Sequence, residues 1–379
     1  MDGRLNLQQY LQELEQVVNI DSGSKNAAGV AKVAEIFTER FEKLGWSVQT
    51  HRFHEEIGPS LEMSNCGDAP CDVLILGHMD TVFAAGAAAE RPFAVRDGRA
   101  YGPGVVDCKG GLTLVHYVLQ SLQQDGVLKN LAVRVAFNAD EEISSVHSRA
   151  WLEQLAVKSG CVLVAEPGRP NGDMVNQRKG IARYELEICG VAAHAGADHE
   201  KGRSAVEELA HWILALQEKT NYEAGTTVNV GVVAGGSAPN VVAAQARAQV
   251  DVRVLDISEA ELVEQFLRKK EATPFTAGVT VKVTGGLRRP PMLPSAQTLA
   301  LGKILGRIGA EMDISVNWAA TGGGSDGNFA AHLGVPTLDG LGPVGGRAHS
   351  EEEYLELSSL ESRFELWCGL LTQLAEKKK

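Results

Sequence analysis

Apolar positions along the first half of the chain alternate between helical and extended spacing. Leu7, Leu11, Leu14 and Val18 recur on one face with a period of about 3.6 residues, which predicts an amphipathic helix. Further helices are expected over residues 26–44, 109–122 and 148–157, and strands over 46–53, 71–77, 131–138 and 161–165. This succession of strands and helices predicts an α/β domain with a doubly wound, mostly parallel sheet.

The pattern changes near residue 180, where apolar and polar residues begin to alternate strictly. Strands are expected over 181–190, 226–235 and 244–254, and helices over 204–217 and 259–270. The order is that of a ferredoxin-like α+β domain with an antiparallel sheet. After Pro290 the α/β pattern resumes with helices over 296–308, 326–332 and 358–375. We therefore predict one discontinuous domain, 1–179 and 288–379, with a domain inserted at 180–287.

Composition narrows the class of protein. The length of 379 residues suits two domains, and no apolar run approaches the roughly 18–20 residues of a membrane span. The net charge of −12 opposes a nucleic-acid partner. The N-terminus shows no signal-peptide pattern, and the six cysteines form no C-x-x-C pair. We expect a reduced, cytoplasmic chain without a membrane partner.

Histidine and carboxylate residues follow the predicted parallel strands. His78 comes after the strand at 71–77, Glu142 after the strand at 131–138, and Glu166 after the strand at 161–165. A glycine-rich loop leads from a strand near 336–338 to His349, and Asp107 lies in the loop YGPGVVDCKGG. Ligands bind beyond the carboxyl ends of such strands, and imidazole and carboxylate are zinc ligands. The sequence thus predicts a metal site at this edge.

A pair of metal ions needs a shared ligand, and a carboxylate with two oxygens suits that role. Asp107 is the natural bridge, with His78 and Glu166 completing one metal and Glu142 and His349 the other. Taken singly, each of these residues is more often an ordinary polar loop residue. Their joint placement at one sheet edge favours the metal site.

Two neighbouring carboxylates complete the expected centre. A ligating histidine usually gives its second N–H to a carboxylate, and Asp80 is two residues from His78. Adjacent residues of extended backbone point in opposite directions, so Glu141 faces the cavity if Glu142 faces a metal. Glu141 is then the predicted general base for a water molecule.

Seven motifs in this order resemble the dinuclear zinc exopeptidases and amidohydrolases. They are HMDTV (78–82), YGPGVVDCKGG (101–111), NADEE (138–142), AEP (165–167), AAHAG (192–196), GGGSD (322–326) and AHS (348–350). The family includes glutamate carboxypeptidase of the carboxypeptidase G type, aminoacylase, dipeptidases, tripeptide aminopeptidase and succinyl-diaminopimelate desuccinylase. The resemblance spans most of the chain and is closest to the glutamate carboxypeptidase branch.

The resemblance implies two Zn²⁺ ions per chain, with Co²⁺ or Mn²⁺ as substitutes, and a role for each matching residue. It assigns the metals to His78, Asp107, Glu142, Glu166 and His349, the general base to Glu141 and the carboxylate behind His78 to Asp80. His194 is similar to the family histidine that stabilises the oxyanion in a partner subunit's active site. A homodimer through the inserted domain is implied.

The implied substrate is a small peptide or N-acyl amino acid with a free carboxylate. Three features suit its recognition: Arg253, whose guanidinium matches a carboxylate, Asn240, by resemblance, and the residues Gly323, Gly324 and Ser325 before a predicted helix. Because Arg253 and His194 lie in the inserted domain, closure about hinges near 178–181 and 286–290 is expected to assemble the site.

The sequence departs from the family pattern at several positions. Cys108 follows the bridging aspartate where a second acid is frequent, and Ser144 replaces a usual glycine, which is expected to change a turn. Asp173 and Thr227 stand where glutamate carboxypeptidases have residues that hold glutamate, so a glutamate preference does not carry over.

Other classes of protein fit the sequence less well. The loop GPGVVDCKGG does not provide a G-x-G-x-x-G that opens a helix directly after a strand, as a doubly wound oxidoreductase requires. Neither GGSAPN nor GGGSDG is interpreted as the strand–helix nucleophile elbow of a serine hydrolase. A non-catalytic metal-binding relative is expected to have lost Glu141 or a ligand, yet all are present. An exopeptidase and an N-acyl-amino-acid amidohydrolase both remain open.

Overall fold

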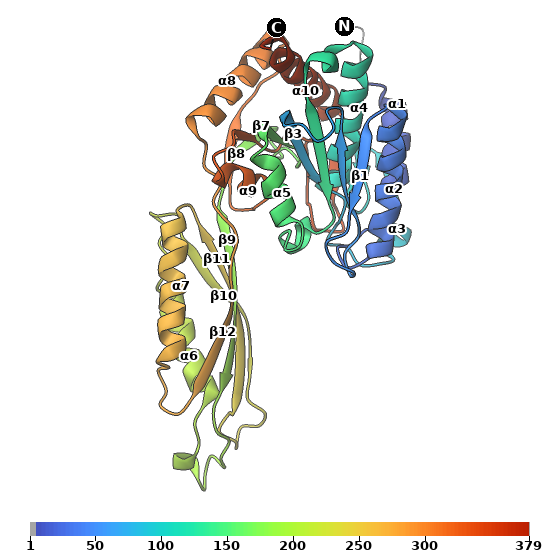
Figure 1. Cartoon of the computed structure of the whole chain (residues 1–379). Helices are drawn as coiled ribbons and strands as arrows, with labels where there is room; N and C mark the ends of the chain where they lie inside the picture. Colours follow the sequence, from blue (N-terminus) through green and yellow to red (C-terminus); the bar gives the residue numbers. More distant parts are fainter. Residues whose placement is uncertain (1–4, 379) are drawn as a thin grey trace. The chain divides into compact units, whose positions relative to one another are not determined.

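The computed structural model describes residues 5–378, which form two compact units (Figure 1). Unit 1 contains the chain up to Gln177, residues 293–321 and the chain from Ser325 onward. Unit 2 contains residues 178–292 together with the short segment 322–324. Within residues 5–378, none of the helices combines the length and apolar composition that crossing a membrane requires.

A six-stranded sheet with the order β1-β2-β6-β3-β7-β14 lies at the centre of unit 1. The parallel strands are β3 (Cys71–His78), β6 (Val133–Asn138), β7 (Ser159–Val164) and β14 (Thr337–Leu338). At one edge, β1 (Ser47–His51) and β2 (Ser60–Ser64) run antiparallel, and β2 was not predicted. The mostly parallel sheet is confirmed.

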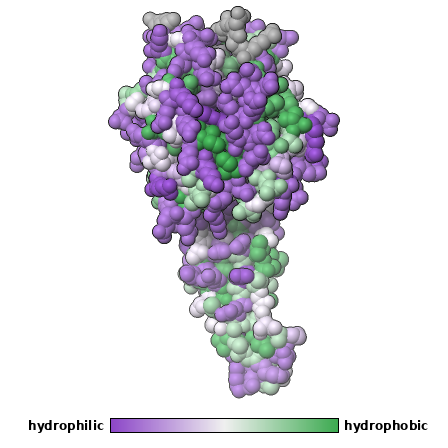
Figure 2. Space-filling model, turned by 90° about the vertical axis from the view of Figure 1, so that its right-hand side faces the viewer, coloured by the Kyte–Doolittle hydropathy of each residue, from purple (hydrophilic) through white to green (hydrophobic). Residues whose placement is uncertain are grey.

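Helices cover both faces of this sheet, as the doubly wound pattern predicts. One face packs on the larger apolar core with α1 (Leu7–Val18), α2 (Ala27–Lys43), α4 (Gly111–Gln124), α8 (Ala296–Glu311) and α10 (Ser359–Glu376). A smaller core on the other face lies under α5 (Arg149–Ala156) and α9 (Gly327–His332). The surface of unit 1 is mainly hydrophilic in Figure 2.

The helix expected over 109–122 begins later than predicted. A wide turn (Val105–Gly110) precedes α4, and Asp107 within it has non-helical dihedrals of φ −115° and ψ 90°. A Cβ at Gly111 would lie 2.0 Å from the Ala165 carbonyl oxygen, so only glycine lets α4 start this close to the end of β7. The Asp107 loop is thereby held beside the sheet edge.

Short strands complete unit 1, and none of them was predicted. A four-stranded sheet joins β15 (Gly345–Gly346), β16 (Tyr354–Glu356), β5 (Arg99–Tyr101) and β4 (Ala94–Arg96). The remaining elements are β8 (Met174–Arg178), β13 (Trp318–Thr321) and α3 (Ala87–Glu90). The β16–β5 pairing brings the loop that carries His349 beside the segment that leads to Asp107.

Unit 2 is an antiparallel sheet covered by two helices. Its strands, in the order β10-β11-β9-β12, are β10 (Thr227–Gly235), β11 (Gln245–Val254), β9 (Gly180–Cys189) and β12 (Thr280–Arg289). The helices α6 (Ala205–Gln217) and α7 (Ile257–Ala272) share an apolar core with the sheet. On the edge strand β10, Val232 and Val233 are half exposed, and apolar residues are visible on this unit in Figure 2. The element order is the predicted ferredoxin-like one.

Candidate metal centre

The carboxyl ends of three parallel strands bring the first candidate residues together. β3 ends at His78, which pairs in register with Asn138 at the end of β6. Glu166 follows two residues after the end of β7, on the other side of β3. Because parallel strands end at the same edge, a short extension beyond each strand is enough to place a polar side chain at one point.

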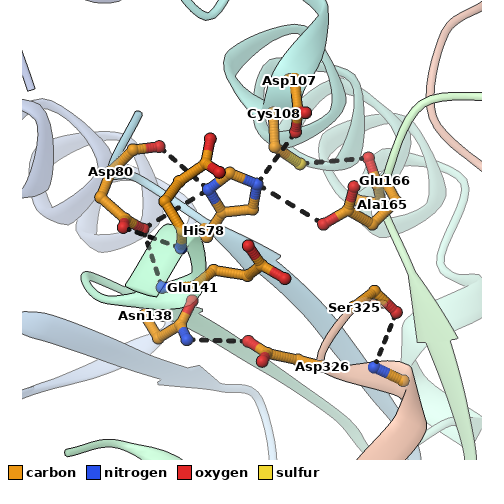
Figure 3. A network of polar contacts seen from close by, with 12 residues as sticks. His78, Asp80, Asp107, Cys108, Asn138, Glu141, Ala165, Glu166, Ser325 and Asp326 are labelled. Atoms are coloured by element: carbon orange, nitrogen blue, oxygen red, sulfur yellow. Dashed lines mark hydrogen bonds and ion pairs between the residues drawn. The ribbon is translucent and has the colours of Figure 1, made fainter. Parts of the chain in front are cut away.

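The His78 ring faces two carboxylates with one nitrogen. Its Nε2 lies 3.1 Å from Asp107 Oδ1 and 3.5 Å from Glu166 Oε1, and the residue is 1% exposed. Its Nδ1 lies 2.9 Å from the main-chain oxygen of Asp80. Figure 3 shows Asp80 on one side of the ring and Asp107 with Glu166 on the other. The backbone contact therefore leaves Nε2 directed at the carboxylates.

Asp107 presents its second oxygen to the other candidate histidine. Its Oδ2 lies 3.2 Å from His349 Nε2, and that nitrogen lies 3.2 Å from Glu142 Oε2. Each oxygen of Asp107 thus faces one imidazole, the arrangement expected of a bridging carboxylate. The His349 side chain is 53% exposed, so this end of the site opens to solvent.

These residues fit a pair of divalent metal ions. Tetrahedral ligands at roughly 2.0–2.2 Å from zinc lie roughly 3.3–3.6 Å apart, close to the separations of 3.1–3.5 Å observed here. Glu142 Oε1 is buried without a hydrogen-bond partner, as expected of an oxygen that awaits a ligand partner. Two imidazoles and three carboxylates are hard to borderline donors, and Zn²⁺ accepts such a set.

The electrostatics of the cluster reflect this crowding of opposite charges. Burial by itself lowers the pKa of His78, but its contacts with Asp107, Asp80 and Glu166 raise that pKa well above the ordinary value. Contacts with Asp107 and Glu142 raise the pKa of His349 to about 11. Burial raises the pKa of Glu142 to about 7. In the metal-free protein, protons on the imidazoles therefore balance the carboxylate charge.

Asp80 organises the turn that carries Glu141 and Glu142. Its Oδ1 accepts the Glu141 N–H (3.1 Å), and its Oδ2 accepts the Glu142 N–H (3.2 Å) and the Ser24 hydroxyl (2.7 Å). The carboxylate is 3.4 Å from His78 Nδ1, farther than the main-chain oxygen of the same residue. The nearest partner of His78 Nδ1 is therefore the main-chain oxygen of Asp80 and not the expected carboxylate. The Asp80 side chain instead positions the turn that carries Glu141 and Glu142.

A second buried carboxylate, Asp326, supports the same turn from the other side. It accepts hydrogen bonds from Asn138 Nδ2 (2.7 Å) and from the Ser145 hydroxyl (2.5 Å). Figure 3 shows the Asn138–Asp326 contact below His78. No function was predicted from the sequence for Ser24, Asn138 or Asp326. Asn138 and Asp326 do lie within the NADEE and GGGSD motifs, whereas Ser24 belongs to no motif.

The departures noted in the sequence have local explanations. Ser144 has a φ of 74°, the left-handed conformation that a glycine would adopt, so the turn is kept rather than changed. Cys108 is fully buried, and its thiol lies 3.3 Å from the Ala165 carbonyl oxygen. Its sulfur also lies within 4.8 Å of ligand atoms of His78 and Glu166. The thiol therefore forms part of the wall of the centre.

His194 lies in unit 2 and has a defined tautomer. Its Nδ1 accepts the backbone N–H groups of Gly196 and Ala197, each at 3.1 Å. The proton of the neutral ring is therefore on Nε2, and the residue is exposed. Asn240 lies in a neighbouring turn, and its carbonyl oxygen accepts the Ala195 N–H at 3.0 Å. Unit 2 thus holds these two predicted residues side by side.

Two predicted substrate-binding residues, Arg253 and Ser325, are bonded to other groups of the chain. Arg253 forms a two-pronged ion pair with Asp251 (2.7 and 2.9 Å), and its Nη1 donates to the Gly322 carbonyl oxygen. Ser325 is fully buried, and its hydroxyl donates to Asp339. That geometry does not support the expected substrate contact for Ser325. The helix α9 begins at Gly327, so Gly323 and Gly324 precede it, as expected.

Three arginines of unit 2 gather at the segment 322–324. Besides Arg253, Arg178 donates from Nη1 to the Gly323 carbonyl oxygen (3.3 Å). Arg289 is 2% exposed, and its Cδ lies 2.8 Å from the point where a Cβ on Gly324 would be. Of these three arginines, only Arg253 was predicted to bind substrate, because the other two belong to no motif.

The sequence of the chain is similar to those of known metallopeptidases and related amidohydrolases. The sequence profile described as Peptidase family M20/M25/M40 matches residues 74–373. Carboxypeptidase G2 of Pseudomonas sp. (strain RS-16) is 28% identical over 379 residues, covering 97% of this chain and 90% of that protein. Acetylornithine deacetylase of Shigella sonnei (strain Ss046) is 27% identical over 357 residues, covering 89% of each.

Solved structures share the fold at low sequence identity. A tripeptidase from Staphylococcus aureus has a TM-score of 0.83 and 23% identity, covering 99% of this chain and 100% of that one. An M20 family metallo-carboxypeptidase from Sulfolobus solfataricus has a TM-score of 0.76 and 17% identity, covering 97% and 99%. These likenesses confirm the fold expected from the sequence.

Proposed function

The chain belongs to peptidase family M20/M25/M40 and is a hydrolase of peptide or amide bonds, and we propose that it is a metal-dependent exopeptidase of the carboxypeptidase or dipeptidase type. Its substrate would carry a free carboxylate beside the scissile bond. The observation that carries the proposal is the position of Asp107, which presents one oxygen to His78 and the other to His349. That geometry suits two metals held by one bridging carboxylate.

Five residues would hold two Zn²⁺ ions. His78 and Glu166 would ligate one ion, Glu142 and His349 the other, and Asp107 both. When bound, the ions supply Lewis acidity that activates water and polarises the scissile carbonyl. Co²⁺ or Mn²⁺ would substitute, because the same nitrogen and oxygen donors accept them.

Glu141 would move the proton. Its carboxylate takes a proton from the attacking water and gives it to the leaving amine. The Asp80 carboxylate accepts the backbone N–H groups of Glu141 and of Glu142, which belongs to the proposed ligand set. These bonds would keep Glu141 next to the metal ions. His194 would donate its Nε2–H to the oxygen that becomes negative as water adds. We propose that it does so in a second copy of the chain, as a homodimer.

The arginines near 322–324 would bind the substrate carboxylate. Arg178, Arg253 and Arg289 bring three positive charges to one segment of a chain whose net charge is −12. Guanidinium groups bind carboxylates through parallel hydrogen bonds. Asn240 would help to orient the substrate from its place beside His194.

The second candidate function is N-acyl-amino-acid deacylation. It is favoured by the 27% identity to an acetylornithine deacetylase, which nearly equals the identity to carboxypeptidase G2. The same centre would serve both reactions, since each cleaves an amide bond beside a carboxylate. Dipeptides, glutamyl amides of the folate type and N-acetyl amino acids, assayed with Zn²⁺- or Co²⁺-loaded protein, distinguish the two.

The test of the proposal is Glu141→Gln. This variant should keep its bound metal, measured by elemental analysis, and lose about 10²–10⁴-fold in kcat on the best substrate of that panel, the usual effect of a general base. Glu352→Gln, at an exposed acid of the His349 loop, is the control. A Glu141→Gln variant with nearly unchanged kcat would refute the assignment.

A further inference from the structure

One buried acid outside the proposed ligand set lies beside the metal centre. Glu353 follows His349 by four residues and is 1% exposed, whereas its neighbours Glu351 and Glu352 are exposed. Carboxylates are rarely buried unless their oxygens are bonded. The burial of Glu353 therefore indicates that its two oxygens have bonding partners inside the protein.

The Glu353 carboxylate binds the backbone of the turn that carries Asp107. Its Oε1 accepts the N–H groups of Val106 (2.9 Å) and Asp107 (3.0 Å), and its Oε2 accepts the N–H of Gly104 (3.1 Å). These distances are those of good hydrogen bonds. The turn from Gly104, whose φ is 74°, to Asp107 thus directs three backbone N–H groups at the Glu353 carboxylate.

The strand pairing fixes where Glu353 stands. It directly precedes β16, whose Tyr354 and Leu355 pair with Tyr101 and Ala100 of β5. The same strand pairs with β15, so β15 and β16 enclose the loop 347–353 that carries His349. Glu353 is therefore at the base of the loop of one proposed ligand while it holds the backbone of another.

A buried lysine belongs to the same turn. The Lys109 side chain is 1% exposed and donates from Nζ to the carbonyl oxygens of Ile20 (2.9 Å) and Pro103 (3.4 Å). Because Pro103 directly precedes Gly104, Lys109 and Glu353 both bind the backbone of the turn that leads to Asp107.

We propose that Glu353 is a positioning residue for the metal pair. By holding the Gly104–Asp107 backbone from the base of the His349 loop, it sets the separation of the bridging carboxylate and the exposed histidine ligand. The contact between Asp107 Oδ2 and His349 Nε2 (3.2 Å) is the distance it would control. The inference rests on the proposed metal centre and not on the identity of the substrate.

The test is a Co²⁺ titration of metal-free Glu353→Gln. The amide oxygen of glutamine can still accept two N–H groups, but its NH₂ then faces the Gly104 N–H. Removing such outer partners of a metal site commonly costs about 10–100-fold in metal affinity. We expect the Co²⁺ bound at Asp107 and His349 to be weakened about 10–100-fold in chelator competition, with a changed visible spectrum. Glu351→Gln, an exposed acid two residues away, should match the wild type.

Glu353→Ala separates positioning from general stability. It removes all three bonds, so its Co²⁺ affinity should fall further than that of Glu353→Gln while circular dichroism shows a folded protein. A lower melting temperature of folded metal-free variants with unchanged Co²⁺ affinity and spectrum would overturn the proposal. If Glu353→Ala does not fold, the glutamine variant decides alone. No turnover is measured, so wild-type protein that binds two Co²⁺ but cleaves no peptide would refute the proposed function and leave this inference intact.

Discussion

Asp80→Asn tests whether the acidic turn is held in place from its backbone. Asparagine keeps the shape of aspartate and one acceptor oxygen. With that oxygen in the place of Oδ1, the Glu141 N–H keeps its bond (3.1 Å), and the new NH₂ faces the Glu142 N–H and the Ser24 hydroxyl. The hydroxyl can turn and accept, so the Glu142 N–H is the donor that loses its partner.

The magnitude follows from that single lost acceptor. A buried donor left without a partner costs about 1–3 kcal/mol, so the free energy of unfolding should fall by that amount in urea titrations. Because the lost bond belongs to Glu142, metal affinity should fall about 10–100-fold. Small displacements of reacting groups cost about 10²-fold in rate, so kcat should fall by at least that factor in the metal-saturated variant.

Asp72→Ala is the matched control. Asp72 lies at the other end of β3, and its Oδ2 accepts the Ala132 N–H at 2.9 Å, a bond that alanine cannot make. This variant should lose comparable stability and keep its metal affinity and kcat. An Asp80→Asn protein that is destabilised like Asp72→Ala but has normal metal affinity and kcat would show that Asp80 only stabilises the fold.

Two further predictions concern the metal-free protein. Both proposed histidine ligands have raised pKa values, about 11 for His349, so metal binding at them would displace their protons. Metal affinity should then rise with pH by about tenfold per unit for each proton released. Zn²⁺ calorimetry at pH 6 and pH 8 checks this, and equal affinities would contradict it. Ser144→Gly should raise the free energy of unfolding by about 0.5–1 kcal/mol, because a φ of 74° is strained for serine. A destabilised Ser144→Gly protein in urea would refute that strain.

The fold was predictable where patterns are long. The helices and buried parallel strands show clear periods over eight or more residues or continuous apolar runs, and they were found. The strand β2 has five residues and is buried on both faces, and β15 has two. Segments this short carry no readable period. Their pairing is decided by residues far away in the chain.

The clustering of the candidate ligands was predictable for a related reason. His78, Glu142 and Glu166 follow strands that were themselves recognisable, and a parallel sheet aligns its strand ends. The supporting residues are not encoded in this way. Glu353 and Asp107 are 246 residues apart in sequence, and their contact depends on the pairing of two three-residue strands. Local sequence therefore indicated the candidate ligands but not the residues that hold them in place.

Substrate recognition was harder to predict because residue type does not show whether a side chain is already bonded. Ser325 and Arg253 both have suitable chemistry for a carboxylate. Within the described structure, the Ser325 hydroxyl is committed to Asp339 at 2.5 Å, and the fork of Arg253 is committed to Asp251. A substrate carboxylate must compete with an internal one at Arg253, so recognition by Arg253 alone would be weak. The proposed recognition of the substrate carboxylate therefore includes Arg178 and Arg289, which lie at the same segment 322–324 as Arg253.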